Sequence, residues 1–286
     1  MKFAWIQHHK DAFDVTCMCA ILGVSRSGFY ASQTRPAGRK ALRKEQILEN
    51  IRAVHVQSRG TYGSPRITAE LAEQGVCACV NTVAKYMKLS GIRSKSKRRF
   101  RVSTTDSTHH HPAAPNLLQR RFAALVPDQK WCCDITYVPT AEGFLYVAAV
   151  IDCCSRRIVG WSMSENLQAQ LCVDALAMAL SKRRPKAGLL HHSDRGVQYA
   201  CSEYRSILES HGITASMSRT GDCYDNALME SFWGTLKTEL THHELYPTRE
   251  EARRSIFEYI EVFYNRRRRH SAIGYMSPEQ FEASLN

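Results

Sequence analysis

The fold of this chain is decided by the stretch WCCDITYV at residues 131–138. Its aromatic and β-branched residues predict a β-strand. Asp134 lies in the middle of the stretch, where a charge is costly to bury unless it is paired or binds a metal ion. The stretch therefore predicts a strand that carries a functional carboxylate.

The segments that follow this strand predict a mixed α/β sheet. Three consecutive strands, followed by alternating helices and strands, are typical of a five-stranded sheet in an α/β domain. A final helix is expected to open at Thr248 with a capping box and to end near the basic cluster 266–270. The further strands are predicted at 144–151, 158–162, 189–193 and 215–217, and the other helices near 171–180, 201–210 and 226–240.

The residues before this sheet predict helical regions. Patterns of helix, tight turn and helix occur at 14–32, where Ser25 can cap the second helix, and again at 62–89, where Asn81 can do so. An ordinary helical hairpin is the alternative for each. We divide the chain into an N-terminal helical region (1–58), a helix-turn-helix-like domain with a basic tail (59–102), a linker (103–125) and an α/β domain (126–286).

The positive charge of the chain is concentrated in its first part. Residues 1–125 hold 21 Lys and Arg against 7 Asp and Glu, whereas residues 126–286 hold 18 against 20. This segregation favours a DNA-binding module attached to an enzyme, with a solvated basic surface as the alternative. The candidate phosphate contacts are Arg26, Lys85, Lys88, Arg98 and Arg99.

Apolar runs and cysteine spacing indicate where in the cell the protein is expected. No apolar run is long enough for a membrane span or a signal peptide, so we expect a cytoplasmic, nucleoid-associated protein and no membrane partner. The eleven cysteines form no C-x2-C pair. We therefore expect no structural zinc, and cysteines that are reduced and mostly buried.

Three acids, Asp134, Asp194 and Glu230, are the candidate catalytic residues and metal ligands. Asp194 directly follows the predicted strand 189–193, and Glu230 lies on a later helix, so the three can converge at one edge of the sheet. Converging carboxylates bind Mg²⁺, with Mn²⁺ as a possible substitute, and two such ions can promote in-line displacement at a phosphodiester. Each acid by itself could equally be an ordinary surface or pairing group.

The spacing around Glu230 sharpens this hypothesis. Thirty-five residues separate Asp194 from Glu230, and Lys237 follows Glu230 by two helical turns. Lys237 and Asn226 therefore share a helical face with Glu230, and we expect both to contact DNA. A solvated helix lysine is the alternative for Lys237.

Several motifs together resemble the second-reading-frame (OrfB) transposases of the IS3 family of insertion sequences, over nearly the entire chain. The motifs are WCCDITY at 131–137, HSDRGVQY at 192–199, ESFWGTLK at 230–237 and YNRRRRHS at 264–271. The resemblance implies an RNase H-like integrase core and Mg²⁺-dependent strand cleavage and strand transfer at terminal inverted repeats. Its departures are small: Val197 and Trp233 stand where serine and phenylalanine are common.

The resemblance also implies partners. An upstream-frame (OrfA) protein or fusion usually supplies a further helix-turn-helix and a leucine zipper, and no sustained heptad pattern occurs in this chain. We expect a homo-oligomer on DNA. Two other functions remain open at this point: a metal-dependent nuclease that cuts without joining, and a DNA-binding regulator that uses only the helical regions.

Overall fold

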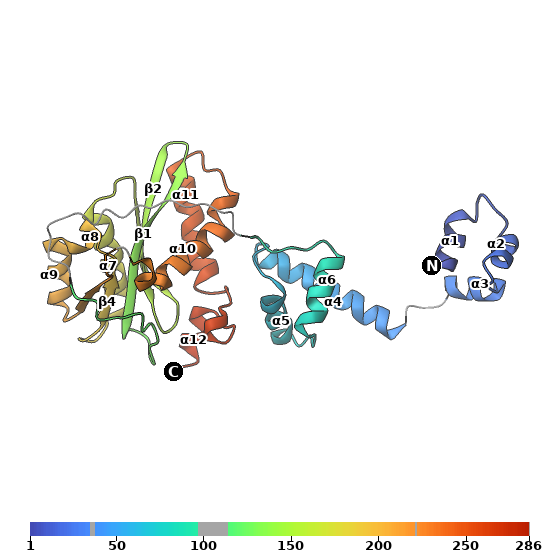
Figure 1. Ribbon diagram of the computed structural model, residues 1–286, viewed down its shortest axis with the longest axis horizontal. Helices are drawn as coiled ribbons and strands as arrows, with labels where there is room; N and C mark the ends of the chain where they lie inside the picture. The colour runs from blue at the N-terminus through green and yellow to red at the C-terminus, as the bar shows by residue number, and fades with distance from the viewer. Residues whose placement is uncertain (35–37, 97–113, 221, 286) are drawn as a thin grey trace. The chain divides into compact units, whose positions relative to one another are not determined.

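The computed structural model describes residues 1–34, 38–96, 114–220 and 222–285 (Figure 1). These residues divide into two compact units, Met1–Ala53 and Val54–Asn286. The predicted DNA contacts Arg98 and Arg99 and the first part of the predicted linker, 103–113, lie outside the described residues. Within those ranges, no helix has the length and apolar character needed to cross a membrane.

The first unit is built from short helices around a small apolar core. Asp14 accepts a hydrogen bond from the backbone of Cys17 at 3.2 Å and so caps the second helix. Gly23 turns the chain with φ of +63°, and Ser25 accepts a hydrogen bond from the Gly28 amide at 3.0 Å, as predicted. The core consists of Ile6, Met18, Cys19 and Phe29. The helices are α1 (Lys2–His9), α2 (Val15–Ile21), α3 (Arg26–Thr34) and most of α4 (Arg39–Gln57).

The second unit begins with the end of α4 and two packed helices, α5 (Ser64–Glu73) and α6 (Val80–Leu89). Ile67 and Leu71 of α5 and Val83 and Met87 of α6 are buried, which is the apolar stripe that an amphipathic helix presents to its neighbour. The N-cap of α6 is Cys79 and not Asn81, so the helix begins two residues earlier than predicted.

A mixed five-stranded sheet forms the centre of the second unit, as predicted. Its strand order is β3-β2-β1-β4-β5, with β1, β2 and β3 antiparallel and with β4 parallel to both β1 and β5. The strands are β1 (Lys130–Thr140), β2 (Gly143–Asp152), β3 (Ile158–Ser164), β4 (Leu190–Ser193) and β5 (Thr214–Met217).

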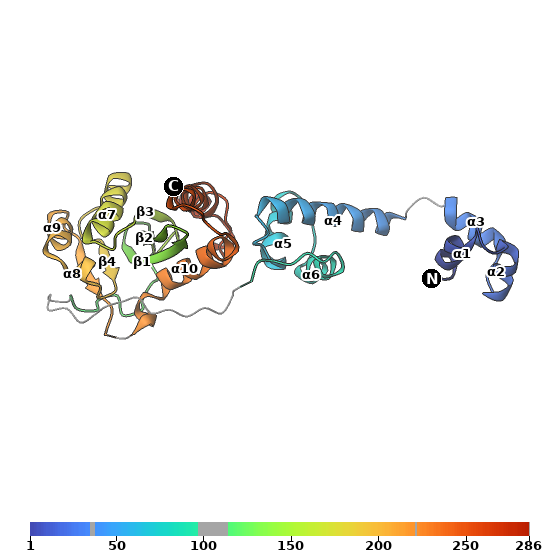
Figure 2. The same ribbon diagram turned by 90° about the horizontal axis from the view of Figure 1, so that it is seen from above.

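Helices cover both faces of this sheet. Figure 2 shows the strands between α7 (Ala169–Arg183) on one side and α10 (Ala227–Glu239) on the other. Gly160 of β3 lets α7 pack very closely, because a Cβ atom there would lie 2.2 Å from the Ala175 carbonyl oxygen. The short α8 (Val197–Ala200) and α9 (Ser202–Ser210) follow β4.

The described end of the predicted linker packs on the core. Residues 114–125 contain no helix or strand, yet Leu118 is buried. The backbone amides of Leu117 and Leu118 donate hydrogen bonds to the Ser216 hydroxyl of β5, at 3.0 and 3.2 Å. This part of the chain is therefore attached to the sheet and does not act as a free tether.

The chain ends in helices that follow α10. Thr248 accepts a hydrogen bond from the Glu251 amide and caps α11 (Arg249–Phe257), which continues as a π-helical segment over Glu258–Tyr264. Ser277 and Gln280 form the capping box of α12 (Pro278–Ala283). In the basic cluster 266–270, Arg268 and Arg269 are buried, so this cluster is not simply a solvated basic patch.

Candidate active site

The strand register places Asp134 and Asp194 side by side. Cys132 of β1 pairs with His192 of the parallel strand β4. Asp134 and Asp194 each lie two residues further along, and neighbouring strands are about 4.8 Å apart. The alternation of side chains points both acids to the same face, because both lie two residues beyond a register pair. The predicted convergence of these two acids is thus built into the sheet.

One face of α10 lies along β1. Asn226, at the start of the helix, donates a hydrogen bond from its amide to the Cys133 carbonyl at 3.0 Å. Trp233 donates from its indole Nε1 to Asp134 Oδ2 at 3.1 Å. One turn later, the Lys237 Nζ atom lies 5.3 Å from the centre of the Tyr137 ring.

Glu230 lies between these contacts on the same helical stripe, since positions 226, 230, 233 and 237 recur every three or four residues. It is exposed, in the first turn of α10. The helix therefore brings the third acid close enough to Asp134, on the central strand β1, for their charges to interact.

The electrostatics of Asp134 differ from those of an ordinary paired carboxylate. Burial raises its pKa well above the usual value, and the negative charge of Asp194 raises it further, with a smaller contribution from Glu230. The hydrogen bond from Trp233 acts in the opposite direction. The negative charges of these acids thus repel one another, and a bound divalent cation would offset this repulsion.

Lys237 is held beside these carboxylates. Burial lowers the pKa of its ammonium group, whereas the negative charge of Asp134 acts to raise it. Its position over the Tyr137 ring is a cation–π contact, which fixes a long side chain that would otherwise be mobile. A solvated helix lysine would show none of these contacts.

Asp225 shows what a structural acid looks like in the same region. It is buried and accepts hydrogen bonds from Arg219, Arg120 and Asn116 at 2.8 to 3.0 Å. The Arg219 guanidinium holds the pKa of this carboxyl well below its usual range. Asp225 fixes the segment before α10 through its cationic partners, whereas the side-chain donor to Asp134 is the neutral indole of Trp233.

The two histidines that precede Asp194 serve the fold. Burial lowers the pKa of His191 to about 3 and that of His192 to about 4, so both rings are neutral at pH 7. His191 Nε2 lies 3.0 Å from the Tyr204 hydroxyl, and both ring nitrogens of His192 face serine hydroxyls, those of Ser216 and Ser218. Their partners are on α9, on β5 and just beyond β5.

The donor set at this edge fits a hard divalent cation. The acids supply oxygen atoms, and their mutual repulsion favours a cation. The neighbouring histidines His191 and His192 instead face hydroxyl groups on other elements. Among the described residues, however, no three His, Cys, Asp or Glu side chains are gathered as closely as a finished metal site. The assignment of Asp134, Asp194 and Glu230 as ligands therefore stays a prediction.

The remaining predicted DNA contacts have different surroundings. Arg26 at the start of α3, and Lys85 and Lys88 on α6, are exposed, as a phosphate contact requires. Asn226 is buried and its amide is used to hold α10 on β1. This placement fits a positioning residue better than the DNA contact that its helical spacing predicted.

Sequence reasoning missed the contacts made by Trp233 and Tyr137. Trp233 lies three residues after Glu230 and four before Lys237, so its helical phase was a usable signal. Tyr137 lies three residues after Asp134 on β1, so the alternation of side chains predicts that it points to the opposite face. Its spacing therefore gave no indication of the contact with Lys237.

Comparison with known proteins agrees with this architecture. Models of the integrase core domain match residues 125–223 and 211–278, and a model of an HTH-like domain matches residues 42–100. The insertion element IS600 31 kDa protein of Shigella sonnei is 49% identical over 92% of this chain and 97% of its own length. The transposase InsF for insertion sequence IS3A of Escherichia coli is 44% identical over 99% of this chain and 98% of its own.

Among solved structures, the HTLV-2 integrase catalytic core domain in complex with magnesium is similar to this chain. The match has 16% sequence identity and a TM-score of 0.44, and it covers 56% of this chain and 99% of that one.

Proposed function

The chain belongs to the IS3 family of insertion-sequence transposases, and from this premise we propose that it cuts and joins DNA strands with Asp134, Asp194 and Glu230. The family membership makes it an enzyme of DNA transposition with a DNA-binding region. We propose further that it acts at the terminal inverted repeats of its own element and carries out strand transfer by in-line displacement at a phosphodiester.

One observation carries this proposal: the strand register aligns Asp134 with Asp194, and α10 presents Glu230 on the face that contacts β1. The three carboxylates would hold Mg²⁺, with Mn²⁺ as a possible substitute. When bound, such ions neutralise the phosphodiester and activate the attacking water or 3′-hydroxyl.

The other residues of the site position its parts. Asn226 holds the start of α10 on β1 and so places Glu230. Trp233 orients the Asp134 carboxylate, and Lys237, supported by Tyr137, is suited to bind a DNA phosphate next to the acids. Arg26, Lys85 and Lys88, together with Arg98 and Arg99, would bind phosphates away from the reacting bond.

The proposal extends to organisation and partners. We propose four parts, with a helical region (1–58), a helix-turn-helix-like domain (59–102), a connecting segment (103–125) and the catalytic domain (126–286). We further propose a cytoplasmic, nucleoid-associated protein that acts as a homo-oligomer on DNA, with an upstream-frame (OrfA) protein or fusion supplying further DNA recognition.

A strand-transfer assay tests the chemistry. Purified protein is incubated with Mg²⁺, a labelled element end and a target duplex, and joined product is measured. Asp134→Asn, Asp194→Asn and Glu230→Gln should each lower joining by roughly 10³-fold, because each removes several kcal/mol of transition-state stabilisation. EDTA should abolish joining by the unaltered protein.

Glu209→Gln, an exposed acid on α9, is the matched control and should join normally. Normal joining by any of the three triad variants would overturn the assignment. Nicks without joined product would indicate a nuclease, and binding without either would indicate a regulator.

A further inference from the structure

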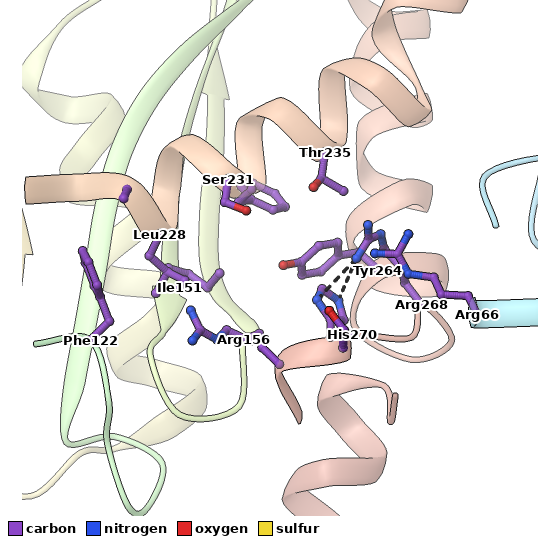
Figure 3. Close-up of a pocket in the computed structure, with 14 residues that line it drawn as sticks. Arg66, Phe122, Ile151, Arg156, Leu228, Ser231, Thr235, Tyr264, Arg268 and His270 are labelled. Atoms are coloured by element: carbon purple, nitrogen blue, oxygen red, sulfur yellow. Dashed lines mark hydrogen bonds between the residues drawn. The ribbon is translucent and has the colours of Figure 1, made fainter. Parts of the chain in front are cut away.

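A pocket of about 350 Å³ lies on the face of α10 next to the catalytic stripe (Figure 3). Ser231 and Thr235 of α10 line it, and they are rotated around the helix axis from Glu230, which precedes Ser231 directly. The pocket is therefore separate from the carboxylates, yet it is built on the same helix.

The pocket is strongly cationic. Three arginines, Arg66, Arg156 and Arg268, line it, and none of its lining residues is a carboxylate. In Figure 3, Arg156 enters from the loop that follows β2, whereas Arg66 and Arg268 approach from the opposite side.

One acid outside the lining offsets only part of this charge. Arg268 forms a bidentate pair with Glu239, with distances of 2.8 and 2.7 Å, and Arg66 lies 4.0 Å from the same carboxylate. One carboxylate cannot neutralise two guanidinium groups. Burial and then the charge of Arg268 lower the pKa of the neighbouring His270 well below its usual value, so this ring is neutral and adds hydrogen-bonding capacity without charge.

The backbone of the loop that carries Arg156 is held in place. Arg156 itself is left-handed, with φ of +64°, a conformation that residues other than glycine adopt at a cost. Asp152 fixes the loop by accepting hydrogen bonds from the amides of Cys154 and Ser155 at 2.9 and 2.8 Å.

The guanidinium of Arg156 has an unused hydrogen-bond donor. Its Nε atom is buried and has no hydrogen-bond partner among the described residues. A buried donor without a partner is costly, and such positions call for a ligand or another functional explanation. A strained backbone, a fixed loop and an unsatisfied side-chain donor thus coincide at one residue.

We propose that this pocket binds a phosphate group of a DNA strand, with Arg156 as its principal contact. Guanidinium groups, a neutral imidazole and the Ser231 hydroxyl form the donor set that a phosphate oxygen accepts from. A strand held there would pass beside Glu230, because consecutive residues of α10 serve the two sites. The inference rests on the proposed function in taking DNA as the source of the phosphate.

The test measures DNA binding by the full-length chain without metal, so that it does not depend on catalysis. The dissociation constant of a labelled duplex carrying the element end is measured over a series of NaCl concentrations. Arg156→Gln should weaken binding roughly tenfold and reduce the slope of log K against log salt by about 0.9, the value for one phosphate contact. Arg156→Lys should retain most of the slope.

Arg184→Gln is the matched control, because Arg184 is exposed and also has a left-handed backbone, with φ of +47°, but does not line the pocket. It should leave affinity and slope unchanged. Ser231→Asp provides an independent variant at an exposed position, where a new carboxylate facing the arginines should also weaken binding.

Equal slopes for Arg156→Gln and Arg184→Gln, with unchanged binding by Ser231→Asp, would overturn the proposal. So would a second result, in which Arg156→Gln abolishes thermal stabilisation by inorganic phosphate but leaves DNA affinity intact, since the pocket would then serve free phosphate. Failure of the unaltered protein to join strands would contradict the proposed function and leave these binding results interpretable.

Discussion

Trp233 is the side chain whose contribution at the candidate site is easiest to isolate. Its indole donates one hydrogen bond, at 3.1 Å, to the Asp134 carboxylate. Phenylalanine is common at this position in the family. It keeps an aromatic ring and removes the hydrogen-bond donor. The substitution therefore tests one hydrogen bond without emptying the space that the ring fills.

We predict that Trp233→Phe lowers strand joining about 10- to 100-fold and raises the Mg²⁺ concentration needed for half-maximal activity. Groups that orient a metal ligand typically have effects of this size. Joining is to be measured across a Mg²⁺ titration. Trp161→Phe is the control, because Trp161 donates an equivalent bond to Glu261 on another part of the domain. Identical titrations for the two variants would show that Trp233 does not orient Asp134.

At the scale of elements, β4 carries both a site acid at its end and a buried histidine within it. His191 lies against Tyr204 of α9, and burial lowers its pKa to about 3. In the unfolded chain its pKa is near 6.5. The unfolded state therefore binds a proton first as the pH falls, and stability is lost below about pH 6.5.

We predict that His191→Gln makes the chain less sensitive to acid. Between pH 7 and pH 5 the free energy of unfolding of the unaltered protein should fall by about 2 kcal/mol more than that of the variant. Urea denaturation at the two pH values measures this difference. His211→Gln, at an exposed position beyond α9, should behave like the unaltered protein. Equal losses of unfolding free energy in all three proteins would show that His191 does not cause the acid sensitivity.

The elements themselves followed closely from the sequence. The strand predicted at 131–138 is β1, Lys130–Thr140, and the helix predicted at 226–240 is α10, Ala227–Glu239. Local periodicity determines both, since alternation and helical spacing are properties of neighbouring residues. The same spacing correctly placed Asn226, Glu230 and Lys237 on one face.

Contacts between distant residues could not be predicted in the same way. The hydrogen bond from Trp233 to Asp134 depends on how α10 is rotated against β1. Leu118 is buried, although it lies in the segment 103–125, whose prolines and polar residues are typical of a linker. A run of arginines at 266–269 gives no sign in sequence that Arg268 finds a buried carboxylate.

At the scale of the second unit, Glu239 connects segments that are far apart in the chain. Its carboxylate pairs with Arg268 and accepts a hydrogen bond from the Tyr259 hydroxyl at 2.8 Å. Its backbone carbonyl accepts one from Lys95 Nζ at 2.9 Å. The Arg268 and Glu239 side chains are only 5% and 7% exposed, so this ion pair depends on both partners.

We predict that Glu239→Gln lowers the free energy of unfolding by about 3–5 kcal/mol, because it leaves the buried Arg268 charge without its counterion. Chemical denaturation measures the loss. Glu250→Gln is the matched control, since Glu250 pairs with Arg254 at side chains that are 62% and 79% exposed, and it should cost less than about 1 kcal/mol. Equal losses of unfolding free energy in the two variants would mean that the buried ion pair contributes no more to stability than the exposed one.

The indole of Trp233 gives the enzyme an optical reporter of its own. The emission of a tryptophan that donates to a carboxylate changes with the charge near that carboxylate. The emission of Trp233 should therefore change when a metal ion binds at Asp134. The chain has only four tryptophans, and replacing Trp5, Trp131 and Trp161 would leave Trp233, beside the candidate catalytic acids, as the single tryptophan. Site occupancy could then be followed in real time, with no label attached to protein or DNA.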